Sequence, residues 1–207
     1  ICKKKKFINN KKNQVKIKKK IPQESGLSEG SMNAATILNF LIKKKFIKIN
    51  QKKILQITKL IGSDVILGIN PKSAILSSNS KIKKFLKTPN FNILLVRPNF
   101  GCSTKKIYSG VKRFSKSKFN NPKKNMMNLN SLLKYENDLE KVAFSKYPKL
   151  KILKSFLENL NKPLFVRMTG SGSVMVAYYQ KKQDCELAKV RFKRKFKNYW
   201  CNTSKTI

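Results

Sequence analysis

The sequence predicts an α+β protein of two lobes. Helical and strand-like patterns alternate along both halves of the chain, and no repeat period relates one half to the other. The 207 residues are enough to bury a hydrophobic core, and the polar, proline-containing stretch 79–91 is the best candidate for a boundary. We therefore expect one lobe over residues 1–85 and a second over residues 90–207.

Hydrophobic periodicity predicts the elements of the first half. Residues 14–21 alternate imperfectly between apolar and charged, which indicates a strand leading into a glycine loop. Residues 31–43 carry apolar side chains at helical spacing, with Ser31 as the expected N-cap. A second helix is predicted over residues 51–61, and Gly62 ends it before a short apolar segment.

The second half shows the same alternation. We expect, in order, a buried strand, a capped helix, a loose surface loop, two helices and two strands, over residues 91–96, 104–114, 115–130, 137–144, 148–160, 164–168 and 174–179. A second glycine loop at 169–173 joins the last two strands. The tail after residue 190 interleaves aromatic and basic residues, and we expect it to pack on the second lobe as a final amphipathic element.

The charge is extreme, with 48 basic and 9 acidic residues and a net charge of +39. Such a charge is typical of a polyanion-binding protein. However, lysine, asparagine and isoleucine are abundant together while arginine is scarce, a composition that an AT-rich coding sequence produces, so we expect no nucleic-acid partner. Histidine is absent, which excludes an imidazole base and a histidine-ligated metal.

The cysteines and apolar runs indicate a cytoplasmic protein. Cys2, Cys102, Cys185 and Cys201 form no C-x-x-C pair, and we expect free thiols of a reducing compartment. The longest apolar runs are too short to span a bilayer, so no membrane association is expected. The sequence leaves the oligomeric state open.

Two glycine loops and one isolated carboxylate are the candidate functional features. Gly26 and Gly30 allow a sharp turn into a helix whose first N–H groups attract an anion, although a purely structural turn uses the same residues. Asp64 is the only acidic residue between Glu29 and Glu136, and its alternative role is a helix N-cap. Because histidine is absent, a proton acceptor has to be a carboxylate or a desolvated lysine.

The order of these motifs resembles the GHMP superfamily of small-molecule kinases. The superfamily loop P-x-x-x-G-L-G-G-G-S-S-N-A-A is matched by P-Q-E-S-G-L-S-E-G-S-M-N-A-A at 22–35, and its second landmark by G-S-D-V at 62–65. N-D-L-E at 137–140 and M-T-G-S-G-S at 168–173 follow. N-A-A together with N-D-L-E favours the branch that acts on a cytidine diphosphate-linked methylerythritol over homoserine, mevalonate or galactose kinases.

The resemblance implies a fold and an activity. The fold is the two-lobed GHMP kinase fold, with a ribosomal protein S5 domain 2-like N-terminal lobe, here incomplete, and a ferredoxin-like C-terminal lobe. The activity is phosphorylation of the tertiary 2-hydroxyl of that small-molecule substrate by ATP with Mg²⁺, a step of the non-mevalonate route to isoprenoid precursors.

The resemblance also implies roles for individual residues. The expected ATP-binding residues are Pro22, Gly26, Leu27, Ser28, Gly30, Ser31 and Asn33. Ser31 is expected to approach the magnesium ion, and Asp64 to accept the substrate hydroxyl proton or orient that hydroxyl for in-line attack. Gly170, Ser171 and Gly172 are expected to bring the second lobe's backbone close to the substrate or the first loop.

The chain departs from the superfamily pattern inside the loop. Ser28 and Glu29 stand where two glycines are usual. A carboxylate aimed at polyphosphate would repel it by about 4 kcal/mol at contact distance, unless Glu29 points to solvent. A side chain forced to positive φ would add a strain of about 1 to 3 kcal/mol.

A second departure is the short stretch before the loop. Superfamily members carry there the first strands of the N-terminal lobe, a lysine that pairs with the catalytic aspartate and much of the substrate pocket. We therefore expect an N-terminally incomplete copy with an exposed sheet edge. The alternatives are another GHMP kinase, of homoserine or mevalonate type, and an inactive remnant that binds RNA through its lysines.

Overall fold

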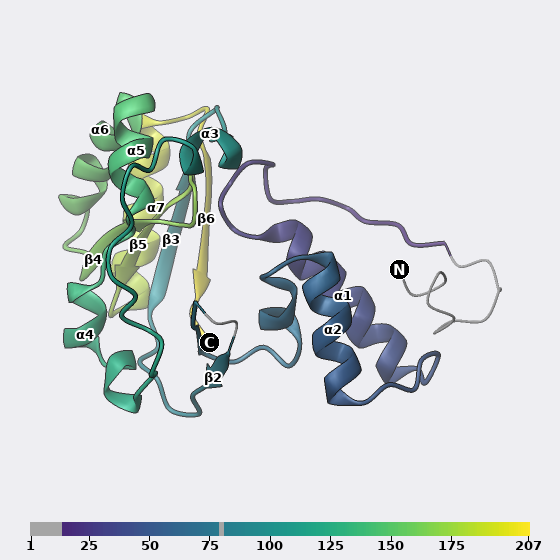
Figure 1. Ribbon diagram of the computed structural model, residues 1–207. Coiled ribbons are helices and arrows are strands. Elements are labelled where there is room, and N and C mark those ends of the chain that lie inside the picture. The colour runs from purple at the N-terminus through teal and green to yellow at the C-terminus, as the bar shows by residue number, and fades with distance from the viewer. Residues whose placement is uncertain (1–13, 79–80) are drawn as a thin grey trace.

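The structure is a computed structural model that describes residues 14–78 and 81–207. Its elements are α1 (Glu29–Lys43), α2 (Gln51–Ile61), η1 (Val65–Gly68), β1 (Ala74–Leu76), β2 (Ile82–Lys84), β3 (Asn92–Arg97), α3 (Thr104–Tyr108), η2 (Lys124–Met127), α4 (Leu129–Lys134), α5 (Leu139–Lys146), α6 (Pro148–Glu158), β4 (Phe165–Met168), β5 (Met175–Tyr179), α7 (Lys182–Lys195) and β6 (Trp200–Lys205). The helices α1 and α2 stand apart from a larger sheet-and-helix layer (Figure 1).

An antiparallel four-stranded sheet in the order β4-β5-β3-β6 organises the larger layer. Leu94 lies between Ala177 of β5 and Thr203 of β6. The helices α5, α6 and α7 cover one face of this sheet (Figure 1). Apolar side chains at helical spacing pack against that face, and Leu150, Leu153 and Leu157 of α6 are all buried. This arrangement agrees with the ferredoxin-like lobe that the sequence predicts.

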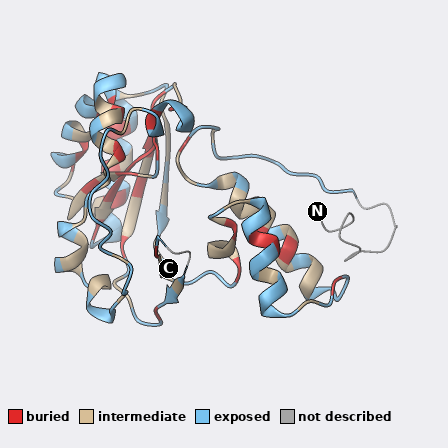
Figure 2. Cartoon of the chain, viewed as in Figure 1, coloured by how far each residue is buried: buried red, intermediate tan, exposed pale blue. Residues whose placement is uncertain are grey.

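A second, smaller core holds α1, α2 and η1 together. It contains Ala35 and Leu38 from α1, Ile57 from α2 and Val65 from η1, all buried (Figure 2). Asn50 caps α2 by accepting a hydrogen bond from the Lys53 N–H, 3.0 Å away, which explains why that helix begins at Gln51. The short antiparallel pair β1-β2 then leads into the sheet of the larger layer.

The aromatic residues of the C-terminal tail pack within the larger lobe. Phe192 is fully buried, and its ring stacks on that of Phe196, with centroids 4.9 Å apart. Phe196 in turn stacks on Tyr199 at 5.0 Å, and the Lys195 ammonium lies over the Phe156 ring at 4.6 Å. The tail therefore packs on the second lobe as predicted, and these rings are engaged with one another.

Periodicity predicted several elements closely. The bounds of α2 are those expected, and β3, α6, β4 and β5 differ from prediction by one or two residues. In the part of the chain that the structure describes, no helix is both long and apolar enough to cross a membrane.

The predictions for residues 14–21, 104–114 and 115–130 were wrong. Residues 14–21 form no strand; they run as an extended segment toward the first glycine loop, and no described strand pairs with them (Figure 1). The helix after Ser103 ends at Tyr108 instead of continuing to residue 114, since the chain turns through Gly110. The expected loop 115–130 contains η2 and the start of α4, which Asn128 caps by accepting from the Ser131 N–H.

Candidate active site

The candidate site is a hollow of about 290 Å³ where the two glycine loops meet the start of η1. Five of the predicted residues line it: Gly26, Ser28, Asp64, Gly170 and Ser171. The structure thus brings together segments about 40 and 140 residues apart in sequence.

The two glycine loops touch through their backbones. Gly26 has φ +73°, and a Cβ placed on it would lie 2.2 Å from the Thr169 carbonyl oxygen. Gly170 has φ +45°, and its Cβ would lie 3.0 Å from the Gly26 carbonyl oxygen. Both positions therefore require glycine, because only glycine combines a positive φ with so close an approach.

Backbone hydrogen bonds tie the first loop to the second lobe. Ser173 and Val174 donate their N–H groups to the carbonyl oxygens of Glu24 and Ser25, at 3.2 and 3.1 Å. The Arg97 guanidinium donates from Nη2 to the Gln23 carbonyl at 2.8 Å. The first glycine loop is thus held next to the start of β5 and the end of β3. The helix that follows it, α1, belongs to the smaller core.

Asp64 faces the first loop. Its Oδ2 accepts a hydrogen bond from the Ser28 hydroxyl at 2.5 Å, and its Oδ1 accepts one from Ser63 at 3.1 Å. Asp64 immediately precedes η1, but its side chain makes no capping hydrogen bond to that helix. The N-cap interpretation of this residue is therefore wrong, and the carboxylate holds a hydroxyl group inside the pocket.

The start of α1 differs from prediction. The helix begins at Glu29, so Gly30 and Ser31 lie in its first turn; Gly30 does not form the sharp turn, and Ser31 is not the N-cap. The residue at that position, Ser28, is left-handed, with φ +50°, and its side chain donates to Asp64 instead of capping. Glycine would take this backbone without strain, so the loop geometry that glycines usually provide is kept at a cost of about 1 kcal/mol or more.

Glu29 is paired with a lysine of the preceding segment. The Lys19 ammonium lies 2.9 Å from Glu29 Oε1, and only 16% of the Glu29 side chain is exposed. The carboxylate therefore neither points freely to solvent nor stands unopposed at the helix N-terminus. Lys19 offsets the charge that this departure from the glycine pattern introduces.

The other predicted residues lie around the pocket without lining it. Pro22, Leu27, Gly30, Ser31, Asn33 and Gly172 belong to this group. The Ser31 hydroxyl lies near the end of α2, since its Oγ would be 3.8 Å from a Cβ placed on Gly62. The Leu27 N–H donates to the Ser25 hydroxyl at 3.3 Å, which helps to shape the loop.

Four further residues that line the pocket were not predicted from the sequence: Glu24, Ser25, Thr104 and Tyr108. The Thr104 and Ser171 hydroxyls lie 3.0 Å apart, so the start of α3 contacts the second glycine loop. The only sequence signal was the capping pair Ser103-Thr104. Behind the loops lies Cys102, a fully buried residue; burial raises the pKa of its thiol to about 11.

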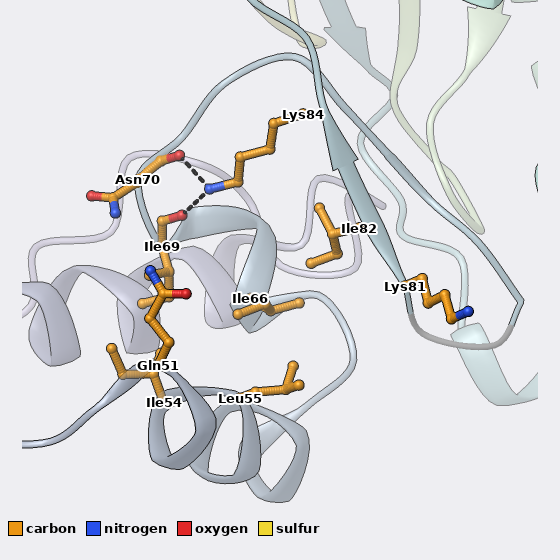
Figure 3. Close-up of a pocket in the computed structure, with 9 residues that line it drawn as sticks. All are labelled: Gln51, Ile54, Leu55, Ile66, Ile69, Asn70, Lys81, Ile82 and Lys84. Atoms are coloured by element: carbon orange, nitrogen blue, oxygen red, sulfur yellow. Dashed lines mark hydrogen bonds between the residues drawn. The ribbon is translucent and has the colours of Figure 1, made fainter. Parts of the chain in front are cut away.

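A larger hollow, of about 720 Å³, lies away from this chemistry (Figure 3). It is formed by α2, the end of η1 and β2, and its walls are mainly the apolar side chains of Ile54, Leu55, Ile66 and Ile82. The Lys84 ammonium at its edge donates to the carbonyl oxygens of Ile69 and Asn70, at 2.7 and 2.8 Å. No carboxylate lines it, so the smaller hollow at Asp64 is the better candidate for a reaction.

The chain resembles known proteins in sequence and in fold. Residues 114–198 match the family model for the C-terminal domain of GHMP kinases. A solved structure of 4-(cytidine 5'-diphospho)-2C-methyl-D-erythritol kinase superposes with a TM-score of 0.72 at 22% identity, over 90% of this chain and 68% of that one. The homoserine kinase of Cytophaga hutchinsonii superposes with a TM-score of 0.68 at 15% identity, over 91% of this chain and 68% of that one. The fold is that of a GHMP kinase.

Relatives in sequence identify the branch. The 4-diphosphocytidyl-2-C-methyl-D-erythritol kinase of Pelagibacter ubique is 55% identical over 98% of this chain and 72% of its own length. The same enzyme of Petrotoga mobilis is 35% identical over 78% of this chain and 65% of its own length. The chain belongs to the 4-diphosphocytidyl-2-C-methyl-D-erythritol kinase family and spans about two-thirds to three-quarters of the length of these two relatives.

Proposed function

We propose that this chain transfers the γ-phosphoryl group of ATP to the 2-hydroxyl of 4-diphosphocytidyl-2-C-methyl-D-erythritol. The observation that carries the proposal is the carboxylate of Asp64, which already accepts a hydroxyl hydrogen bond from Ser28 in the pocket where both glycine loops meet. A substrate hydroxyl that replaces the Ser28 hydroxyl would be oriented, and relieved of its proton, by the same oxygen.

The loops would supply the phosphate site. In α1 the first helical hydrogen bond runs from the Met32 N–H to the Ser28 carbonyl, at 3.0 Å, so the N–H groups before Met32 are not used within the helix. Together with the helix dipole, they favour the phosphate groups of ATP. The pairing of Glu29 with Lys19 limits the repulsion between the Glu29 carboxylate and those phosphates.

The donors near the pocket suit magnesium. Mg²⁺ prefers one or two carboxylate or hydroxyl oxygens together with phosphate oxygens, and the Asp64 carboxylate and the Ser31 hydroxyl are of that type. When bound, the ion neutralises charge that develops on the transferring phosphoryl group. We propose that the Ser31 hydroxyl contacts the magnesium ion. We also propose that the reaction takes place in a cleft between two lobes, which are residues 1–85 and residues 90–207.

The test is a coupled assay of ADP release with ATP, magnesium and the cytidine-linked substrate. Asp64→Asn removes the proton acceptor but preserves shape, and should lower kcat by about 10²-fold or more. Asp184→Asn, in the first turn of α7, is the matched control and should leave the rate unchanged. Turnover of homoserine or mevalonate instead would favour another branch, and a rate indifferent to Asp64→Asn would contradict the role given to Asp64.

A further inference from the structure

Asn137 connects the start of α5 to the second glycine loop. Its side-chain Nδ2 donates to the Met168 carbonyl at 3.0 Å and to the Gly170 carbonyl at 2.8 Å. Its Oδ1 accepts from the Leu139 N–H at 3.0 Å, so the orientation of the amide is fixed from both ends. The Asn137 side chain therefore binds the loop with one atom and the helix with the other.

Glu140 binds the same loop from one turn further along α5. Its Oε1 accepts from the Met168 N–H at 2.7 Å, and its Oε2 pairs with the Lys154 ammonium of α6 at 2.6 Å. Only 13% of the Glu140 side chain is exposed. Asn137 and Glu140 thus hold the Met168 carbonyl and N–H groups respectively, at the residue where β4 passes into the glycine loop.

Within the loop the Gly172 N–H donates to the Thr169 carbonyl at 2.8 Å, and at its base the Thr169 N–H donates to the Val174 carbonyl at 3.0 Å. Neither bond involves Gly170, whose carbonyl Asn137 holds. The segment 169–173 is Thr-Gly-Ser-Gly-Ser, and two of its glycines have positive φ. Small residues of this kind leave a loop many accessible conformations unless outside groups hold it. The loop nevertheless contacts Gly26 through Gly170 and Thr104 through Ser171, and both contacts lie in the candidate active site.

We propose that Asn137 and Glu140 are positioning residues of the phosphoryl-transfer site. They fix the backbone of residues 168–170, so that the second glycine loop meets the phosphate loop at Gly26. This inference deepens the proposed function and rests on it. In this proposal neither side chain contacts the substrate, and both act by fixing the backbone of the second glycine loop.

The decisive variant is Asn137→Asp. The change is isosteric and keeps the oxygen that accepts from the Leu139 N–H, so the helix start is preserved. It replaces the Nδ2 donor with an acceptor that faces two carbonyl oxygens, so the loop contact is lost. Asn159→Asp is the matched control, because Asn159 also donates Nδ2 to a backbone carbonyl, that of Ser155 at 2.9 Å, but at the exposed end of α6.

Two measurements on the full chain separate the outcomes. In Asn137→Asp, amide hydrogen exchange at Gly172, Ser173 and Val174 should quicken by about tenfold or more, while exchange within α5 stays at the wild-type rate. The kcat should fall by about tenfold or more with a much smaller change in KM, since a mispositioned loop impairs the transition state more than binding. Asn159→Asp should change neither quantity.

Glu140 offers a rescue test. Glu140→Gln keeps an oxygen to accept from the Met168 N–H, so it should retain most of the kcat that Glu140→Ala loses. Unchanged exchange at residues 172–174 in Asn137→Asp would overturn the inference, as would faster exchange with a normal kcat. If the wild-type chain shows no turnover, the proposed function fails. The exchange rates and the ATP affinity of the variants still test whether Asn137 and Glu140 hold the loop.

Discussion

At the scale of single residues, the two non-glycine residues of the first loop each have a partner. Ser28 takes the left-handed backbone that a glycine would take and gives its hydroxyl to Asp64. Glu29 adds a negative charge at the helix N-terminus, and Lys19 supplies a positive one. The substitutions therefore change the loop's chemistry while its geometry is kept.

Lys19→Ala tests the charge pair. Without Lys19 the Glu29 carboxylate would face the ATP phosphates alone, so the KM for ATP should rise about fivefold at low salt, an effect of the size expected for a partly exposed pair. Lys20→Ala removes the same charge from the adjacent residue and should have a smaller effect. A fivefold rise that persists unchanged at high salt would contradict an electrostatic origin.

Ser115→Ala tests a titrating group. The Ser115 hydroxyl and N–H donate to Asp138 at 2.7 and 3.1 Å and hold the pKa of that carboxyl below its ordinary 3.8. A lowered pKa stabilises the fold above the ordinary value, and this contribution disappears as the pH falls through the folded-state pKa. Ser115→Ala should therefore lower the melting temperature at pH 7, by roughly a few degrees, with the deficit shrinking in acid.

Ser117→Ala is the control for this pH dependence. The Ser117 hydroxyl donates to the neutral amide oxygen of Asn120 at 3.0 Å, in the same stretch of chain. The loss of melting temperature in Ser117→Ala should not vary with pH as Asp138 titrates. Melting curves of both variants between pH 7 and pH 3 decide the matter, and a Ser115→Ala deficit that is independent of pH would exclude the role given to Asp138.

At the scale of elements, the site depends on the contact between two loops more than on either alone. The first loop accepts hydrogen bonds from Ser173 and Val174, directly before β5, and the second loop is held by Asn137, directly before α5. The helix α1 that follows the first loop packs in the other core. The pocket at Asp64 therefore depends on how the two cores are placed relative to each other.

Gly26→Ala and Gly30→Ala test this contact as a pair. At Gly26 the new Cβ would meet a backbone oxygen at 2.2 Å in a positive-φ residue, so the free energy of unfolding should fall by at least about 2 kcal/mol. At Gly30, inside the first turn of α1, no atom lies within 4 Å of the new Cβ, and stability should rise by roughly 0.5–1 kcal/mol. Urea unfolding measures both, and equal effects would refute the close approach of the loops.

At the scale of the whole molecule, charge is the dominant unusual property. With 48 basic and 9 acidic residues, ion pairs such as Lys154–Glu140 can neutralise only a minority of the lysines. Exposed residues lie along the outer sides of the helices (Figure 2). The folded state therefore brings like charges together and should be destabilised by their repulsion.

Salt should relieve that repulsion. Raising NaCl from 50 to 500 mM shortens the screening length severalfold, and the melting temperature should rise by roughly several degrees. A preparation with acetylated lysines has lost most of the charge, so its melting temperature should respond less. A melting temperature that falls with salt would mean that attractive pairs outweigh the repulsion.

Local pattern predicted what depends on neighbours in the chain. The ends of α2 follow from Asn50 and Gly62, and β3 and β5 follow from short apolar runs, because capping and burial periodicity act within a few residues. The motifs at 22–35 and 62–65 likewise indicated the class of kinase. The strand predicted at 14–21 failed, since a strand needs hydrogen bonds from a neighbouring strand and its own pattern does not provide one.

Only the tertiary structure decided which distant groups meet. The Ser28–Asp64 hydrogen bond, the Lys19–Glu29 pair and the hold of Asn137 on Gly170 join residues that no local rule relates. Each depends on how packed elements place two segments of the chain within about 3 Å of one another, a precision that side-chain packing sets and residue type does not. Five of the residues that line the pocket were predicted from the sequence, whereas Glu24, Ser25, Thr104 and Tyr108, and the partners of every site residue, were not.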